Sequence, residues 1–233
     1  MTVGRLRSLH RYPVKSLVGE ELERAALDHR GLLGDRLWSV RDPDGKFGSG
    51  KSTRRFRKME GLLDLVASYD DDVPVIRFPD GTTVSGRGAE SDAALSAHVG
   101  RPVSLAREGD VSHFDDGPIH LVTTSTLGEL ARRHGSSVDV RRLRPNLVVE
   151  TPDEGFLEEA WVGRELRIGA GVVLRVRAPM PRCVMVDLPQ RDLPADGGLL
   201  RTATAANGAD VGVVLDVVEP GEVRVGDEVQ LSR

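Results

Sequence analysis

The chain has 233 residues, of which 39% are hydrophobic and 29% are charged, and its formal net charge is −4. This length allows one large domain or two small ones, and the composition is typical of a soluble globular protein. The negative net charge argues against a general nucleic-acid binder, and the lack of an 18-residue apolar run argues against a membrane-spanning protein.

The first part of the chain predicts short strands separated by turns. Residues 37–40 form a short apolar run that leads into Asp-Pro-Asp-Gly at 42–45, a strong turn signal. Residues 78–84 have the same character around Pro-Asp-Gly. A short helix is expected at 91–99, closed by Gly100, and a strand at 102–105.

Residues 45–52 have the spacing G-x-x-x-x-G-K-S of a nucleotide-binding phosphate loop. The strand before it is short and separated from it by Pro43, and the cations that follow oppose the positive start of a helix. A flexible Gly/Ser loop is therefore the preferred interpretation. Residues 51–58 carry five cations and no acid, which indicates either a solvated loop or the wall of an anion-binding cleft.

The second half predicts one good helix and several strands. A helix is expected at 126–134, with Thr126 and Glu129 as a capping box and Gly135 at its end. Residues 172–177 alternate as a half-buried strand does, and residues 223–225 and 229–231 suggest a hairpin. Strands and helices do not alternate regularly, so barrels suit the chain better than a doubly wound sheet.

Cys183 is the only cysteine, so neither an internal disulfide nor a Cys-x-x-Cys metal site is available. A lone cysteine after a hydrophobic strand is ordinarily a small core residue. The alternative is that Cys183 supplies one soft thiolate to a metal whose other ligands come from elsewhere. One cysteine, together with no signal-peptide core in residues 1–16, points to a reducing cytoplasm.

Four local motifs follow one another along the chain. They are Tyr-Pro-Val-Lys-Ser at 12–16, Gly-Leu-Leu-Gly-Asp-Arg-Leu-Trp at 31–38, Leu-Arg-Pro-Asn-Leu-Val-Val at 143–149, and Pro-Arg-Cys at 181–183, followed by Leu-Arg-Thr at 200–202 and the segment 220–227. In this order, over essentially the whole chain, they resemble MOSC proteins with an N-terminal β-barrel domain. That family includes the amidoxime-reducing components and their bacterial relatives.

The resemblance implies a mainly β protein of two packed β-barrel lobes with a few short helices. We expect an N-terminal barrel domain over residues 1–108 and a MOSC domain over residues 109–233. The cofactor of the family, a molybdenum ion held by molybdopterin, should lie between the lobes, because its expected ligands come from both.

By the same resemblance, Cys183 is the metal ligand and the catalytic residue. The residues expected to hold the pterin or its phosphate are Lys15, Ser16, Arg36, Arg144, Asn146 and Arg182. Guanidinium groups bind phosphate bidentately, and lysine adds a point charge. Asp115, Asp116 and His120 are candidates for supporting positions around the cofactor.

Taken singly, these residues also have structural interpretations. Lys15 fits a solvated turn residue, Arg36 an ion pair with Asp35, and Arg144 the start of a strand before Pro145. Arg182 fits a surface residue, and His120 a satisfied barrel residue. The joint pattern favours the cofactor site.

The implied activity is the two-electron reduction of N-hydroxylated or N-oxide small molecules. The chain has no cysteine cluster for an iron–sulfur centre, so electrons are expected from a separate donor of the ferredoxin or flavin reductase type. The general acid is unassigned. The alternatives are a non-catalytic carrier of the molybdenum cofactor or its sulfur and, less favoured, a P-loop nucleotide hydrolase. No nucleic-acid or membrane partner is expected.

Overall fold

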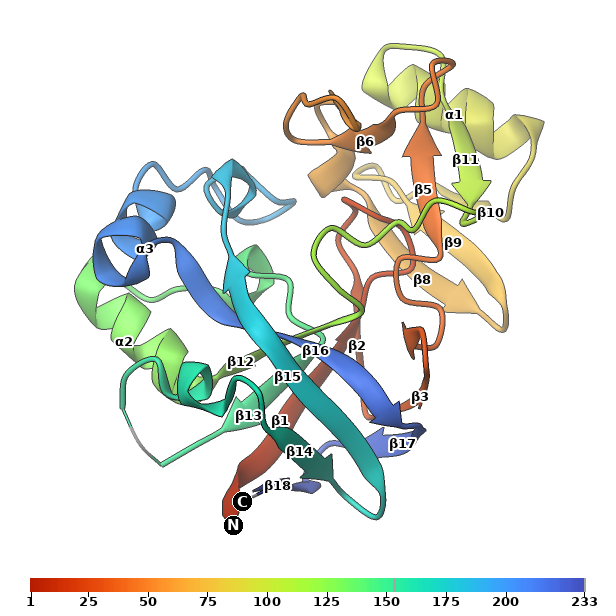
Figure 1. The fold of residues 1–233 in the computed structure, drawn as a ribbon. Helices are drawn as coiled ribbons and strands as arrows, with labels where there is room; N and C mark the ends of the chain where they lie inside the picture. The colour runs from red at the N-terminus through yellow and green to blue at the C-terminus, as the bar shows by residue number, and fades with distance from the viewer. Residues whose placement is uncertain (153, 233) are drawn as a thin grey trace.

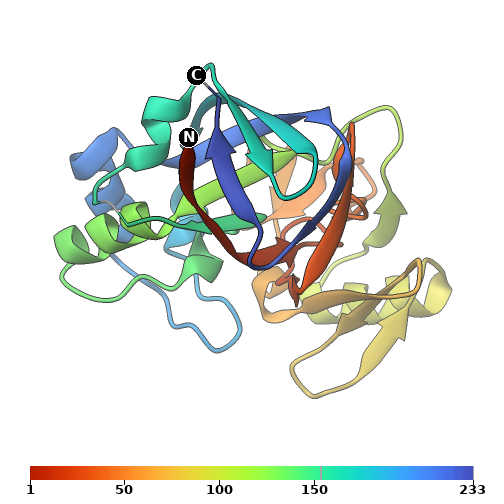
Figure 2. The same ribbon diagram turned by 90° about the horizontal axis from the view of Figure 1, so that it is seen from below.

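The computed structural model describes residues 1–152 and 154–232, and this part of the chain is mainly β, with three α-helices (Figure 1). Its largest element is a sheet that closes on itself into a seven-stranded barrel, seen end-on in Figure 2. The strands of the barrel, in spatial order, are β13 (Leu147–Glu150), β12 (Ile119–Thr123), β16 (Asp210–Glu219), β15 (Val172–Pro181), β14 (Glu165–Ile168), β18 (Glu228–Leu231) and β1 (Thr2–Arg11). Pairing of β1 with β13 closes the barrel and leaves it no open edge.

The interior of the barrel is filled by aliphatic side chains from all of its strands. Alternate residues of a strand point to opposite faces, so Leu166 and Ile168 in β14 are both fully buried while Arg167 between them is exposed. This apolar filling forms one contiguous core. The barrel is therefore a packed scaffold, and the functional site lies outside its interior.

A second lobe stands beside the barrel and is built from small sheets (Figure 1). One sheet contains β5 (Trp38–Arg41), β6 (Phe47–Ser49), β7 (Phe56–Lys58) and β11 (Ser104–Arg107); another contains β8 (Val66–Asp70), β9 (Val73–Arg77) and β10 (Thr83–Ser85). Helix α1 (Ala89–Val99) covers this lobe and ends at Gly100 in the left-handed conformation, as the sequence predicts. The lobe has a hydrophobic core of its own. The mainly β, two-lobed fold class is confirmed.

The two lobes are linked by more than one segment of chain. Strand β1 is a wall of the barrel. The chain then contributes Val14 and Leu17 to the core of the second lobe, and β2 (Glu20–Leu22) returns to pair with β1. A three-stranded sheet joins β3 (Arg24–Asp28) and β4 (Gly31–Leu32) to β17 (Gly221–Arg224), near the other end of the chain. The division near residue 108 stays a prediction, but the strand pairing interleaves the two parts of the sequence.

Helices α2 (Thr124–His134) and α3 (Leu199–Asn207) pack together on the outside of the barrel (Figure 1). The predicted capping box of α2 is wrong. Thr123 is the N-cap, and its hydroxyl accepts a hydrogen bond from the backbone N–H of Thr126. The hydroxyl of Thr126 donates instead to buried Glu158, at 2.6 Å, because that carboxylate needs donors inside the protein. Helix α3 was not predicted.

The predicted hairpin at the end of the chain is also wrong. β17 pairs with β3, whereas β18 pairs with β1 and β14. Two strands that are neighbours in sequence are therefore in different sheets, because each finds its hydrogen-bond partners in a distant segment.

The segment 45–52 does not have the arrangement of a phosphate loop. Residues 47–49 are buried in β6, which pairs in parallel with β7, so residues 50–55 connect two strands rather than a strand and a helix. Short 3₁₀ helices occur at Leu62–Asp64, Val140–Arg142, Leu157–Trp161 and Val184–Val186. Among the described residues, no helix has the length and apolar character needed to cross a membrane.

Candidate functional site

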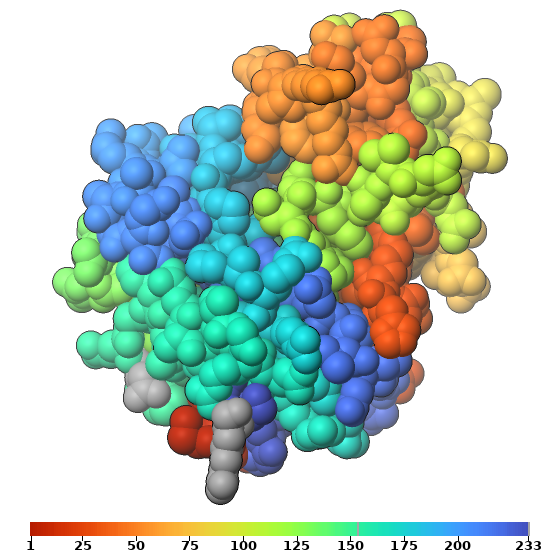
Figure 3. All heavy atoms as spheres, in the orientation of Figure 1, coloured from red at the N-terminus to blue at the C-terminus, as the bar shows by residue number. Residues whose placement is uncertain are grey.

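A cavity of about 290 Å³ lies where the two lobes meet. Figure 3 shows a recess at this place, between orange residues near 50, yellow-green residues near 115 and blue residues near 185. The cavity is lined by Lys15, Ser16, Arg36, Ser49, Lys51, Asp115, Asp116, Arg142, Leu143, Arg144, Met180, Pro181, Arg182, Cys183, Met185 and Val186. The structure therefore brings together all of the predicted site residues except Asn146.

Cys183 lies just beyond the end of β15, where the barrel wall turns into a short 3₁₀ helix. The pairing of β15 with β16 shifts register twice between Val176 and Pro181, and such irregularities bend a strand and re-aim its side chains. The side chain of Cys183 is partly exposed and lines the cavity. The Nζ of Lys51, from the other lobe, lies 3.4 Å from its sulfur.

Lys15 enters the cavity from the turn that follows β1, and it is almost fully buried. Its ammonium group donates to the backbone oxygen of His113 at 2.7 Å and to Asp115 at 2.8 Å. Burial lowers the pKa of Lys15 to about 8, although the charge of Asp115 acts in the opposite direction. The predicted supporting residue Asp115 thus holds the lysine in place from the segment that connects the lobes.

Arg36 and Arg144 both pack against the ring of buried Tyr12. Their guanidinium carbons lie 4.7 and 4.3 Å from the ring centroid. Arg36 also pairs with buried Asp35, whereas Arg144 donates to the backbone oxygen of Leu17 at 2.7 Å. Burial is the largest influence on Arg144 and lowers its pKa, but an arginine starts so high that the group keeps its charge at neutral pH.

Backbone strain is concentrated at this cavity. Six non-glycine residues among those described have a positive φ, and three of them are Ser16, Arg36 and Arg144, with φ of 66°, 50° and 52°. The left-handed region costs an L-residue about 1–2 kcal/mol. Strain of this kind clusters at functional sites, where the surrounding structure holds it in place.

Arg182 lines the cavity, but its guanidinium group makes its hydrogen bonds with buried groups of the protein. It donates to the backbone oxygens of Leu143 and Val211 and to a ring nitrogen of His120. Burial, followed by the charge of Arg182, lowers the pKa of His120 well below its ordinary value, so the ring is neutral and can accept this bond. His120 is thus a buried residue below the cavity, and Arg182 fixes the backbone that carries Cys183.

Asn146 is buried and is the one predicted pterin ligand outside the lining. Its amide oxygen accepts from the backbone N–H of His120 at 3.1 Å and from Arg36 at 3.4 Å, and its amide nitrogen donates to the backbone oxygen of His10 at 3.2 Å. In this position Asn146 orients Arg36 and connects β1 to β12 through hydrogen bonds to His10 and His120.

The basic segment 51–58 contributes one side chain to this cavity, Lys51. Arg57 is paired with Asp42 and Asp44, and Lys58 is paired with Glu60. Sequence reasoning identified the charge of this segment but did not name Lys51 as a site residue. The 132-residue separation of Lys51 and Cys183 leaves no local signal for their contact.

Arg142 is a second residue that sequence reasoning missed. It is buried, and its guanidinium group donates to the backbone oxygens of Val186, Leu188 and Pro194. These contacts hold the loop after Cys183. Ser49, Met180 and Met185 also line the cavity.

The cavity combines one soft donor with a large excess of positive charge. Six cationic side chains and two carboxylates line it, and Cys183 is its one thiol. Within residues 1–152 and 154–232, no three His, Cys, Asp or Glu side chains gather as a metal site. The donor set therefore suits an anionic group that brings most of its own metal ligands and takes one thiolate from the protein.

Two family models match the chain. The MOSC domain matches residues 98–230, more than half of the chain, and the MOSC N-terminal beta barrel domain matches residues 3–114. The chain is 26% identical to mitochondrial amidoxime reducing component 2 of Bos taurus, over 78% of this chain and 66% of the bovine protein. It is 24% identical to the Homo sapiens protein of the same name, over 97% of this chain and 83% of the human one.

A more distant relative is the molybdenum cofactor sulfurase of Oryza sativa subsp. japonica, at 23% identity over 79% of this chain and 28% of the rice protein. Among solved structures, the YUAD protein from Bacillus subtilis has a TM-score of 0.53 at 16% identity, and the match covers 99% of this chain and 96% of that one. At this identity the likeness concerns the fold.

Proposed function

The chain belongs to the MOSC family, and on that basis we propose that it is a molybdenum-cofactor-binding oxidoreductase that reduces N-hydroxylated or N-oxide compounds. The observation that carries the proposal is the meeting of one thiol and six cations in a single cavity between the lobes. Similarity to proteins named amidoxime reducing component supports the reaction class.

The residues present fit a pterin that carries a metal at one end and a phosphate at the other. Cys183 would hold the metal, because a thiolate suits an ion already bound by sulfur. Lys15, Arg36 and Arg144 would bind the phosphate, each by charge-assisted hydrogen bonds. Their buried supports keep these groups in place before any ligand arrives, and they hold Arg36 and Arg144 in left-handed backbone conformations.

When bound, the cofactor would supply the two electrons that, with two protons, convert an N-hydroxyl group to N–H and water. The chain's own residues would orient the cofactor and the substrate and would neutralise their negative charge. Lys51, next to the sulfur, would attract polar or anionic groups to the mouth of the cavity. Arg182 and Arg142 hold the backbone on both sides of Cys183, which keeps the sulfur in a fixed position.

Electrons would come from a separate partner protein of the ferredoxin or flavin reductase type. The chain's single cysteine cannot build an iron–sulfur centre. The reducing cytoplasm stays a prediction.

The experiment is to express the chain in a host that makes the cofactor, and to measure bound molybdenum and pterin together with turnover. Reduced viologen replaces the unknown donor, and the substrates are N-hydroxylated amidines, hydroxylamines, N-oxides and sulfoxides. We expect wild type to contain molybdenum and to reduce at least one N-hydroxylated compound. Cys183→Ala should fold and lose turnover, because the metal loses its protein ligand.

Cys183→Ser is the matched control, since it keeps the size of the side chain and replaces the soft donor with a hard one. Full activity in a folded Cys183→Ala protein would disprove the assignment of the metal ligand. A molybdenum-loaded wild type with no turnover above Cys183→Ala on the whole panel would instead establish the carrier alternative.

A further inference from the structure

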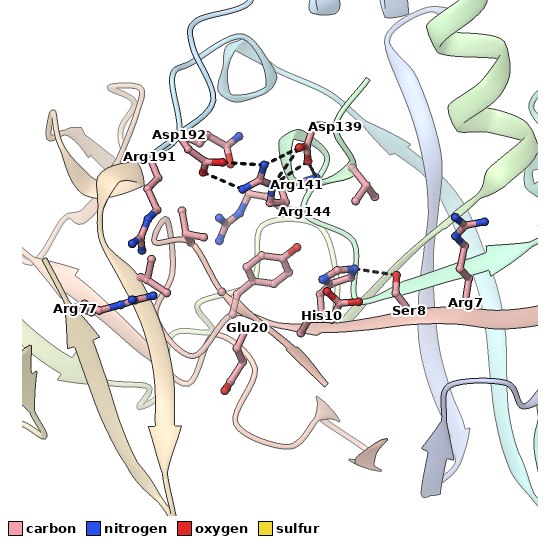
Figure 4. A pocket seen from close by; sticks show the side chains of 17 residues that line it. Arg7, Ser8, His10, Glu20, Arg77, Asp139, Arg141, Arg144, Arg191 and Asp192 are labelled. Atoms are coloured by element: carbon pink, nitrogen blue, oxygen red, sulfur yellow. Dashed lines mark hydrogen bonds and ion pairs between the residues drawn. The ribbon is translucent and has the colours of Figure 1, made fainter. Parts of the chain in front are cut away.

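A second and larger cavity, of about 660 Å³, lies between the lobes (Figure 4). Its wall includes Arg77 from β9, Arg191 and Gln190 from the loop after Cys183, and Arg144. Cys183 does not line it, so it is distinct from the cavity described above, but Arg144 lines both. Its volume is within the range of small-molecule sites, roughly 300–1,000 Å³.

The acidic side chains of this cavity are largely neutralised by partners of their own. Asp139 and Asp192 are both paired with Arg141, and Glu20 is paired with Arg11, whereas Glu21, which is exposed, has no ion pair among the described residues. Arg77 and Arg191 have no acidic side chain within 4.0 Å among the described residues, and neither has Arg144. The cavity therefore holds three arginines without a direct carboxylate partner and one carboxylate, Glu21, without a cationic partner.

Arg191 is presented to the cavity by a tight, well-fixed turn. Gln190 and Leu193 exchange two backbone hydrogen bonds, of 2.9 and 2.7 Å, and Asp192 is held by Arg141. Arg191 itself has a φ of 47°, in the region that L-residues rarely adopt. Figure 4 shows its guanidinium group on the same side of the cavity as that of Arg77, from the other lobe. Two cations that share one side of a cavity repel each other unless an anion lies between them.

Gln190 gives an independent indication of a ligand. It lines the cavity and is only 3% exposed, yet its amide nitrogen has no hydrogen-bond partner within the described part of the chain. A buried donor without an acceptor is costly, so such a group in a native structure calls for a partner from outside the chain. The nitrogen itself is enclosed, so an oxyanion in the cavity would supply the missing acceptor once the Gln190 amide turns towards it.

We propose that this cavity is a second binding site, which takes a small ligand bearing phosphate or carboxylate groups. Arg77 and Arg191 clamp the oxyanion from the two lobes, and Gln190 donates to it after its amide turns towards the cavity. Arg144 extends the site towards the cavity of Cys183. The proposal is independent of the metal, because none of these contacts involves Cys183.

The test is calorimetric titration of the cofactor-loaded protein at low ionic strength, with inorganic pyrophosphate and citrate as the probes. Wild type should show one saturable site. Arg77→Ala and Arg191→Ala should each weaken binding about tenfold, the loss expected for one charge-assisted contact. Both arginines are exposed, so both variants should fold normally. Tighter binding of pyrophosphate than of citrate would indicate a phosphate ligand, and the reverse order a carboxylate ligand.

One control variant separates this site from general attraction of anions. Arg87→Ala removes an exposed arginine of the same lobe that lines neither cavity, and it should not alter probe binding. Arg77 and Arg191 do not line the cavity of Cys183, so weaker binding in their variants also distinguishes the two cavities. Gln190→Met should weaken binding several-fold without destabilising the free protein, because it removes an unsatisfied buried amide. Absence of saturable binding, or equal affinity in wild type and the Arg77→Ala/Arg191→Ala double variant, would overturn the proposal.

Discussion

Lys15 and Lys51 both bring positive charge from the N-terminal half of the chain to the cavity, but in different environments. Lys15 is buried and held by Asp115, whereas Lys51 is partly exposed and its nearest polar partner is the sulfur of Cys183. In the proposed site, the first would belong to a preformed anion site, and the second would place its charge beside the sulfur. Substitutions at the two positions should therefore have different consequences.

Lys51→Ala should lower molybdenum retention and leave the fold intact, because the ammonium group no longer stabilises charge at the sulfur. We expect a loss of about 1 kcal/mol, roughly fivefold in affinity. The measurement is metal content after dialysis against a graded series of chelator concentrations. Lys58→Ala is the matched control, since Lys58 belongs to the same basic segment but does not line the cavity. Equal metal loss in both variants would show that only overall charge matters.

Lys15 should make stability depend on pH in alkaline solution. Its pKa is about 8 in the folded protein and 10.5 ordinarily, so between these values the unfolded chain binds a proton that the folded chain has lost. The free energy of unfolding of the cofactor-free protein should then rise with pH from about 8 to about 10.5 on account of this group. Urea unfolding at pH 7.5 and 9.5 would measure it, and Lys15→Met should remove that part of the rise. Identical pH slopes in the two proteins would contradict the assignment. Anion affinity of the cavity should change the other way, and fall as Lys15 loses its charge.

At the scale of elements, the β15–β16 pair shapes the site more than any helix does. Its register shifts bring Cys183 to the cavity, and β16 passes directly below it. Gly212 in β16 has a φ of +81°, and a Cβ there would lie 2.5 Å from a ring nitrogen of His120 and 2.5 Å from the backbone oxygen of Leu121. The close approach of β16 to His120 thus depends on the missing side chain.

Gly212→Ala should therefore destabilise the protein by about 2–4 kcal/mol, since it combines left-handed strain with a backbone clash. It should also displace His120 and, through it, Arg182. Chemical unfolding gives the free energy, and cofactor content gives the effect on the site. Gly128→Ala is the comparison: its Cβ meets nothing within 4 Å in α2, so it should be neutral or stabilising. A Gly212→Ala protein as stable as wild type would refute the packing argument.

Elements with strong local signals could be predicted from the sequence, and those that depend on distant partners could not. Gly100 and Gly135 do end helices, because a left-handed cap needs only local geometry. The capping box failed because the bonds of Thr126 are decided by Glu158, 32 residues away. The terminal hairpin failed because β17 pairs with β3, at the other end of the chain. Of the residues that line the cavity, the family motifs include Cys183, Arg36, Arg144 and Arg182 but did not point to Arg142, and the contact of Lys51 follows from how the lobes pack.

At the scale of the whole molecule, the two lobes are held together by a shared segment and by hydrogen bonds, as well as by the covalent chain. β1 is a barrel strand, and the turn after it carries Lys15 and Ser16 into the other lobe. Side chains also cross the junction: Tyr12 donates to the backbone oxygen of Pro145, and Arg144 to that of Leu17. Neither lobe keeps all of its contacts without the other.

We therefore expect the whole chain to unfold in one cooperative transition. A fragment of residues 109–233 should fail to fold, because its barrel would lack β1 and would expose the edges of β13 and β18. Calorimetry of the full chain and circular dichroism of the fragment would measure this. Two separated transitions, or a folded monomeric fragment, would show that the lobes are independent.

The pairing of β1 with β18 also bears on how the protein is made. After it leaves the ribosome, β1 must wait for β18, because Thr2 pairs with Gln230. At about 5–20 residues per second, the barrel stays open for roughly ten to fifty seconds of synthesis. The wall that carries Cys183 and the turn that carries Lys15 become parts of one closed structure only after β18 has been made. Loading of this cavity is thus expected to follow synthesis of β18, with the nascent β1 a natural client for a chaperone until its partners emerge.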